Sequence, residues 1–158
     1  MKPGIFVDTD IILDLLARRE PFFTAAARLF SLAEQDNIHI CVSSLAYANL
    51  FSILCKEHSS AIATTILKKL SRLVTVLPVD SETVVLALDA GFNDFEDALQ
   101  YHAALKKGVA CLVTRNIKDF KRSSIEVCTA EEFLARRFQS SLMGEGNPSA
   151  VARTRENP

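Results

Sequence analysis

Glycine is scarce in this 158-residue sequence, with five residues in all. The chain has no G-x-G-x-x-G sequence and no glycine-rich phosphate loop, so we do not expect a nucleotide cradle of that kind. It also lacks an apolar run long enough to span a bilayer and the long apolar segment of a signal peptide. These absences favour one soluble intracellular domain of ordinary size, without membrane contact and located in the cytoplasm.

Neither sign of charge is in excess, because 18 Lys and Arg residues are balanced by 19 Asp and Glu residues. The balance removes the simplest argument for a nucleic-acid-binding protein, although it leaves room for a local basic patch. The four cysteines form no C-x-x-C sequence that would predict a zinc site. We interpret them as reduced thiols, mostly in the core, in a reducing compartment.

Hydrophobic patterning predicts five strands separated by helices. The strands are expected at residues 4–8, 38–42, 74–79, 109–114 and 125–129. The helices are expected at residues 11–18, 22–33, 43–57, 62–73, 80–90, 95–107 and 130–138. Strands that alternate with helices pair in parallel and carry helices on both faces, so the sequence predicts a three-layer α/β domain.

The composition changes near residue 140. Beyond this point few large apolar residues remain and no helical period is evident. The sequence therefore predicts one domain over residues 1–139 and a flexible C-terminal tail over residues 140–158.

Acidic residues flank two of the predicted strands. Asp8 ends the first strand in GIFVDTDIILDLL, and Asp10 follows it. Asp94 and Asp97 lie where the helix before the fourth strand begins, and Asp119 follows that strand. Ligands of an open parallel sheet bind beyond the carboxyl ends of its strands, near the point where strand order reverses. If the first and fourth strands are neighbours, these acids meet at one edge of the sheet.

Such a cluster of carboxylates repels itself unless cations neutralise it. Oxygen ligands without His or Cys spacing select Mg²⁺ or Mn²⁺ rather than zinc. These ions commonly serve phosphoryl chemistry, because they polarise phosphate oxygens and activate water. The pattern therefore indicates a metal-assisted reaction on a phosphate ester.

Each acid alone also has a structural interpretation. Asp94 suits the N-cap of a helix, and Asp97 suits the first turn, where carboxylates are favoured. Asp14 is expected to form an exposed i, i+4 pair with Arg18. The hypothesis of a shared site depends on the coincidence of several acids at one predicted edge.

The chain resembles PIN-domain proteins and is similar to the VapC-type toxin ribonucleases of bacterial toxin–antitoxin pairs. The resemblance covers residues 5–138 and is carried by FVDTDIILDLL, VSSLAYANL, DFEDALQYHAA and LVTRNIKDF, in this order and spacing. It implies an α/β/α domain with a five-stranded parallel sheet, Mg²⁺ or Mn²⁺ at a carboxylate cluster, and hydrolysis of RNA phosphodiester bonds.

The resemblance also implies roles for individual residues. Asp8, Asp97 and Asp119 match the metal-binding acids that carry catalysis, and Asp94 is an added carboxylate that helps to bind a second ion. Residues expected to line the site or to contact substrate are Asp10, Asn49, Thr114, Arg115 and Asn116. Side chains expected to hold the RNA backbone are Arg115, Lys118, Lys121 and Arg122.

The sequence departs from the family pattern at one position. The helix after the second strand usually carries a metal-site glutamate, and Asn49 is found there in this chain. Asn49 shares a helical stripe with Leu45 and Ile53, so we expect its side chain to point inward. An amide offers a carbonyl oxygen but no charge, which makes the predicted site less negative unless Asp94 compensates.

Two other functions stay open on the sequence. Asn49 favours a PIN scaffold that binds RNA or protein without cutting. The segment VDTDI after a strand favours a haloacid-dehalogenase-type phosphatase with Asp8 as its nucleophile. For the ribonuclease, the resemblance implies an RNA substrate, a small antitoxin that covers the acidic groove, as in type II pairs, and a homodimer.

Overall fold

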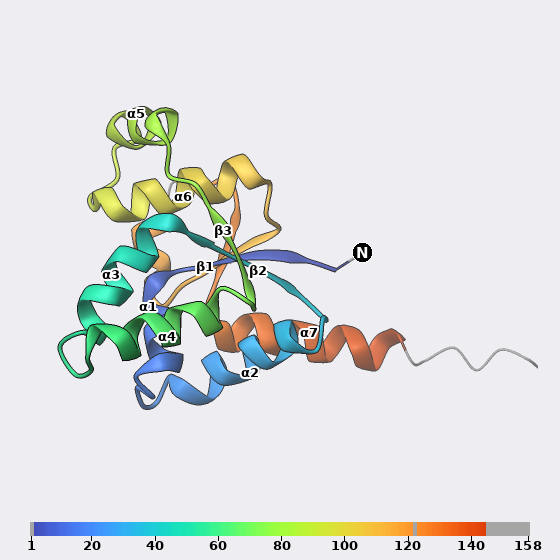
Figure 1. Ribbon diagram of the computed structural model, residues 1–158. Coiled ribbons are helices and arrows are strands. Elements are labelled where there is room, and N and C mark those ends of the chain that lie inside the picture. Colours follow the sequence, from blue (N-terminus) through green and yellow to red (C-terminus); the bar gives the residue numbers. More distant parts are fainter. Residues whose placement is uncertain (1, 122, 145–158) are drawn as a thin grey trace, which may run out of the picture.

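A parallel sheet of five strands lies between two layers of helices in the computed structural model, which describes residues 2–121 and 123–144 (Figure 1). The strands are β1 (Gly4–Val7), β2 (His39–Ser43), β3 (Val74–Leu77), β4 (Cys111–Val113) and β5 (Glu126–Cys128). Their order is β3-β2-β1-β4-β5, and all four neighbouring pairs are parallel. The predicted five-stranded α/β fold is therefore confirmed.

The predicted helices are also present. They are α1 (Thr9–Leu16), α2 (Phe23–Glu34), α3 (Ser44–Leu54), α4 (Ser60–Leu70), α5 (Ser81–Asp89), α6 (Phe95–Lys107) and α7 (Ala130–Gly144). A short 3₁₀ helix, η1 (Ile117–Phe120), follows β4. Among the described residues, no helix is both long enough and apolar enough to cross a membrane.

Alternate residues of β1 face opposite sides of the sheet. Ile5 and Val7 belong to a core shared with α1, α2, α3, α4 and α7, whereas Phe6 packs with Tyr101 of α6 and Phe120 of η1. All three β1 side chains are fully buried. A strand that is covered on both faces needs apolar residues at consecutive positions, which explains the unbroken run at the start of the chain.

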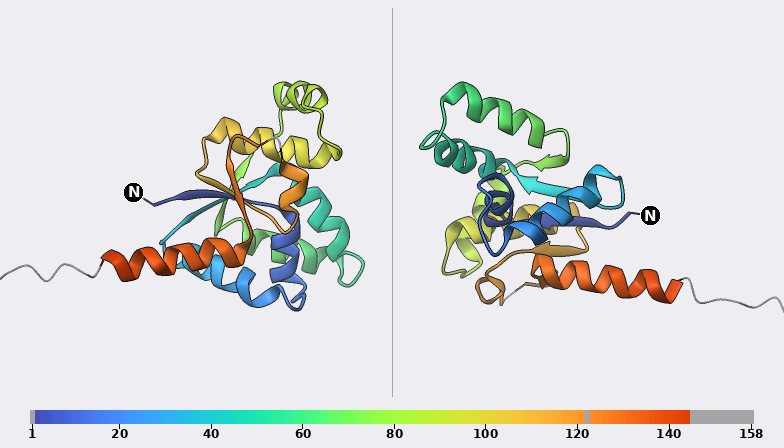
Figure 2. Two further views of the ribbon diagram at one scale, coloured as in Figure 1. Left: turned by 180° about the vertical axis from the view of Figure 1, so that it is seen from behind. Right: turned by 90° about the horizontal axis from the view of Figure 1, so that it is seen from below.

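One layer is thicker than the other. Helix α6 lies directly on the sheet, and α5 packs on α6 at a greater distance from the strands (Figure 1). On the opposite face, α7 lies beside α2 and extends beyond the sheet (Figure 2). The cysteines are free, and Cys41, Cys111 and Cys128 are buried in the core, as predicted.

The predicted boundary of the C-terminal tail differs from the structure. Helix α7 continues to Gly144, so residues 140–144 are helical, and residues 145–158 lie outside the described residues. The hydroxyls of Ser140 and Ser141 donate to backbone carbonyls four residues earlier. Leu142 and Met143 are exposed, so the end of α7 has no buried stripe from which a helical period could be recognised.

The strand order reverses between β1 and β4. These two strands pair directly, with Val7 opposite Val113, as the sequence argument required. Chain segments that leave the carboxyl ends of β1 and β4 therefore begin side by side. Asp8 is the N-cap residue of α1, and Asn116 is the N-cap residue of η1.

Candidate functional site

Asp8 is the buried centre of the candidate site, with 5% of its surface exposed. Its Oδ2 accepts a hydrogen bond from Thr114 Oγ1 at 2.7 Å, and its Oδ1 accepts one from Gln100 Nε2 at 3.1 Å. Burial raises the pKa of Asp8 above its ordinary value, and the two hydrogen bonds oppose that shift. A carboxylate at the end of an apolar strand is thus tolerated because two buried polar side chains donate to it.

Gln100 was not predicted as a site residue. It lies on α6, one turn after Asp97, and is 1% exposed. While its amide nitrogen donates to Asp8, its Oε1 accepts from the backbone N–H and the hydroxyl of Thr9, at 3.4 and 3.5 Å. One sequence feature could have indicated Gln100 as a site residue. It is polar between apolar neighbours, and it lies three residues after Asp97, on the same side of the helix.

Asp97 faces acids from three segments of the chain. Burial raises its pKa to about 7, and the charges of Asp8, Asp94, Asp119 and Glu96 add to this shift. Asp94 has the N-cap role considered above, since its Oδ1 accepts a hydrogen bond from the Asp97 backbone N–H at 3.2 Å. Asp119 lies on η1 and is exposed. The structure therefore brings the four predicted acids close enough for their charges to interact.

Glu96 is a further acid that was not predicted. It is partly buried in the first turn of α6, and its Oε1 accepts a hydrogen bond from Asn49 Nδ2 at 2.7 Å. Burial raises the pKa of Glu96, the bond from Asn49 opposes this shift, and the charges of Asp8, Asp94 and Asp10 add to it. Asn49 thus directs its amide from α3 toward the acidic residues.

Arg115 is bound by acids of α1. Its Nε lies 3.2 Å from Asp14 Oδ2 in an ion pair outside hydrogen-bond geometry, and its Nη2 lies 3.7 Å from Asp10 Oδ1. The guanidinium also lies over the ring of Phe22, 4.3 Å from its centroid. Arg115 therefore fixes the start of the segment after β4 against α1.

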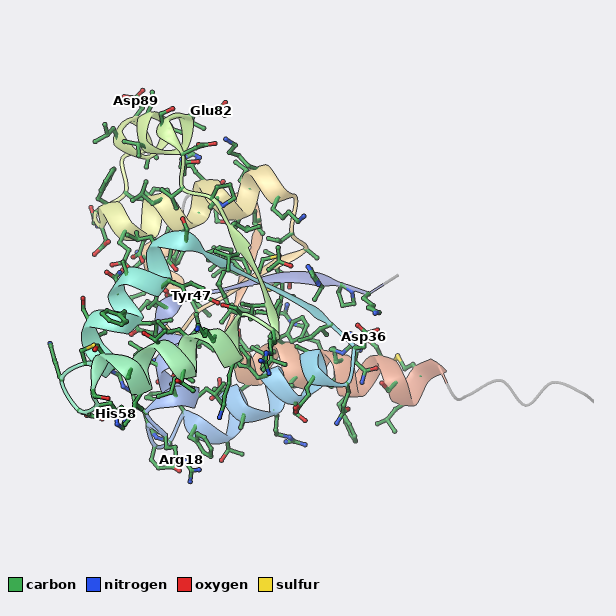
Figure 3. All side chains as sticks on the ribbon, viewed as in Figure 1. Arg18, Asp36, Tyr47, His58, Glu82 and Asp89 are labelled. Carbon is green, nitrogen blue, oxygen red and sulfur yellow. The ribbon has the colours of Figure 1, made fainter. Side chains whose placement is uncertain are left out.

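The predicted surface pair of Asp14 with Arg18 is wrong. Asp14 is fully buried, and burial raises its pKa, while the charge of Arg115 opposes that shift. Arg18 is exposed in the turn after α1 (Figure 3). Its guanidinium lies over the ring of Phe23. Spacing along one helix could not reveal a partner that follows a strand 101 positions later.

The remaining predicted residues lie at the carboxyl end of β4. Thr114 is fully buried, and its Oγ1 also accepts from the Asn116 backbone N–H at 3.1 Å. The side chains of Asn116, Lys118 and Lys121 are exposed. Arg122, which was predicted to contact RNA, lies outside the described residues.

These side chains fit a divalent cation in chemical kind and in charge. The donors are carboxylate oxygens, and burial together with the charges of the neighbouring acids raises the pKa of Asp97, a destabilisation of its charged form that a bound cation would offset. Over residues 2–121 and 123–144, however, the side chains do not converge into a group of three or more His, Cys, Asp or Glu ligands. Metal binding therefore stays a prediction that depends on the chemistry of the donors.

Comparison with known proteins gives concordant matches. A sequence model of the PIN domain matches residues 4–118. Ribonuclease VapC1 of Aquifex aeolicus is 28% identical over 137 residues, which cover 84% of this chain and 94% of that protein.

Two solved structures extend the comparison to the fold. A toxin–antitoxin complex from Klebsiella pneumoniae has a TM-score of 0.61 and 19% identity, covering 80% of this chain and 97% of that chain. Mycobacterium tuberculosis VapC20, a toxin that cleaves the sarcin–ricin loop, has a TM-score of 0.53 and 23% identity, covering 68% and 86%. These two similarities show a shared fold.

Proposed function

Since the chain belongs to the PIN-domain family, we propose that it is a divalent-metal-dependent endoribonuclease, the toxin of a type II toxin–antitoxin pair. One observation carries the proposal: acids from the end of β1, the start of α6 and η1 are near enough for their charges to act on Asp97, and one of them is the buried Asp8. The similarity to Ribonuclease VapC1 supports the same activity.

In this proposal Asp8 and Asp97 hold Mg²⁺ or Mn²⁺, and Asp94 and Asp119 complete or bridge a second position. The bound ion supplies Lewis-acid activation of water and charge stabilisation at the phosphate. Gln100 orients the Asp8 carboxylate, because it donates a hydrogen bond to one oxygen from a fully buried position. Thr114 does the same for the other oxygen.

RNA is proposed to approach along the segment after β4. Lys118 and Lys121 are exposed on either side of Asp119, where they can contact phosphate oxygens. Arg115 also has a positioning role in this proposal, because its guanidinium forms ion pairs with Asp10 and Asp14. We assign it to positioning of the segment that carries Asn116.

A protein partner is part of the proposal. The similar structure from Klebsiella pneumoniae is a toxin–antitoxin complex, which supports a small antitoxin as partner of this chain. Such a partner would place a basic side chain among the carboxylates, because a cation is what this group of acids requires. A homodimer is also proposed, and light scattering at several concentrations tests it.

A PIN scaffold that binds without cutting is the second candidate, and Asn49 is the observation that favours it. The phosphatase alternative is set aside, because the matched family is the PIN domain. Asp8 is also nearly enclosed and accepts hydrogen bonds at both oxygens, which does not suit an attacking nucleophile.

Cleavage of a mixed RNA pool with Mn²⁺, Mg²⁺ or EDTA tests the proposal. We expect cleavage only with metal. Asp97→Asn should reduce it by about 100-fold or more, because changes at residues that only support metal ligands already cost about 10–100-fold. Asp89→Asn, at the exposed end of α5, is the matched control (Figure 3). Cleavage that continues in EDTA, or in Asp97→Asn at the control's rate, would contradict the metal mechanism.

A further inference from the structure

The contact between α3 and α6 joins the position that departs from the family pattern to an acid that was not predicted. Asn49 Nδ2 donates to Glu96 Oε1 at 2.7 Å, across 47 positions of sequence. Both side chains are partly buried. A bond of this length to a carboxylate is charge-assisted, so Glu96 is held in one orientation by α3.

The contact lies next to the proposed metal-binding acids along the chain. Glu96 and Asp97 are consecutive residues in the first turn of α6, and Asp94 is the N-cap residue of the same helix. The bond from Asn49 therefore orients a carboxylate one residue away from Asp97.

We propose that Glu96, oriented by Asn49, is a metal ligand of the site and supplies the negative charge that PIN-domain proteins usually carry on the helix after the second strand. The inference rests on the proposed metal-dependent function. The carboxylate that α3 lacks is then supplied by α6. It lies beside position 49, because Asn49 and Glu96 are in contact.

A purely structural role for Glu96 makes a different prediction. An acid in the first turn of a helix is favoured by the helix dipole even when it is exposed. That role needs neither partial burial nor a bond to another helix, and partial burial of a carboxylate costs free energy. A cation bound to Glu96 would offset this cost. Measurement of metal binding therefore distinguishes the two roles.

The test is a Mn²⁺ titration of the full-length protein, followed by calorimetry and by the electron paramagnetic resonance of free Mn²⁺. Glu96→Gln should weaken Mn²⁺ binding by about tenfold or more, because changes at residues that only support metal ligands already cost about 10–100-fold. Glu57→Gln, an exposed glutamate in the loop after α3, is the matched control and should bind as the wild type does.

A double variant tests the positioning role of Asn49. In Asn49→Glu/Glu96→Gln the carboxylate moves to α3 and the amide to α6, so the hydrogen bond can form in the reverse direction. We expect this double variant to recover most of the Mn²⁺ affinity that Glu96→Gln loses. A structural role for Glu96 would not give such recovery, because position 96 in the first turn of α6 would still lack a carboxylate.

The outcomes separate the inference from the proposed function. Wild-type protein that binds Mn²⁺ and cleaves RNA, with Glu96→Gln equal to Glu57→Gln in Mn²⁺ affinity, overturns the inference alone. Failure of the double variant to recover affinity overturns it as well, provided that circular dichroism shows a folded protein. Wild-type protein that neither binds Mn²⁺ nor cleaves RNA overturns both the inference and the proposed function.

Discussion

The carboxylate of Asp8 lies at the end of a buried strand, and side chains from two distant segments make its burial tolerable. Thr114 comes from the end of β4 and Gln100 from the second turn of α6. The hydrogen bonds therefore connect three segments at the point where the strand order reverses. Removal of either donor should therefore lower both the free energy of unfolding and the affinity for metal.

Thr114→Val tests this connection, because valine keeps the shape of threonine and removes the hydroxyl. Asp8 would lose a donor at 2.7 Å in a nearly enclosed position. We expect the free energy of unfolding to fall by about 1–3 kcal/mol, the usual cost of an unsatisfied buried polar group. Urea denaturation measures it, and Thr64→Val, at an exposed position of α4, is the control. Equal losses in the two variants would refute the role of Thr114.

Arg115→Met tests the buried ion pair with Asp14. The fully buried Asp14 would lose its closest cation, so we expect a loss of about 3 kcal/mol in unfolding free energy. Asp14→Leu/Arg115→Met should be markedly more stable than the single variant, because it leaves no unpaired buried charge. A double variant that is less stable than Arg115→Met would show that the pair is not the source of the loss.

Sequence could predict residues whose place follows from local pattern, but not residues whose role depends on a contact with a distant segment. The positions of Asp8, Asp97 and Asp119 relative to the strands followed from local pattern. Glu96 and Gln100 share α6 with Asp97, but their roles depend on partners in α1 and α3, which no local spacing encodes. The metal-site roles of the predicted acids stay predictions.

At the scale of elements, α5 is attached to α6 through polar contacts at its first turn. Asp80 caps α5 and accepts hydrogen bonds from the Thr83 N–H and hydroxyl, at 2.9 and 2.7 Å. Lys106 of α6 donates to Asp80 and to Glu82, at 2.9 and 2.6 Å. These contacts join two helices that lie on the thick side of the sheet.

Acid should weaken this attachment. The Thr83 backbone bond, the Lys106 bond and the Thr83 hydroxyl hold the pKa of Asp80 below its ordinary value of 3.8. A lowered folded-state pKa adds stability above the unfolded pKa, and this stability is lost as the pH falls below about 4. The melting temperatures of wild type and Asp80→Asn should therefore differ at pH 7, and the difference should shrink progressively as the pH falls below 4. Asp89→Asn is the control, and a difference unchanged at low pH would contradict the mechanism.

Element boundaries were predicted less well than element types, and pairing explains why. The predicted strand at 109–114 shortens to three residues in β4, because its ladder follows the short β1, from Ile5 to Val7. Helix α7 extends past its predicted end, because its last residues are exposed and lack an apolar period. The length of an element is set partly by its neighbours, whereas its type is set by its own residues.

For the whole molecule, the sheet order decides where the chemistry can lie. Local pattern predicts strands and helices but not their order, and only the pairing of β1 with β4 brings the acids to one edge. Because the total charge is nearly neutral, attraction of RNA would have to come from local groups of cations. Lys118 and Lys121 are the exposed cations closest in sequence to Asp119 among the described residues.

Salt dependence of RNA binding tests whether these two lysines contact phosphates. With EDTA present to prevent cleavage, we expect Lys118→Gln/Lys121→Gln to reduce the slope of log affinity against log salt by about 1.4, since each phosphate contact to a single strand contributes about 0.7. Lys68→Gln/Lys69→Gln is the matched control, because the last turn of α4 leads to the amino end of β3, at the opposite edge of the sheet. Equal slopes for the two double variants would mean that RNA does not follow the segment after β4. A reduced slope in the first variant alone would place the RNA backbone beside Asp119, within reach of the acids.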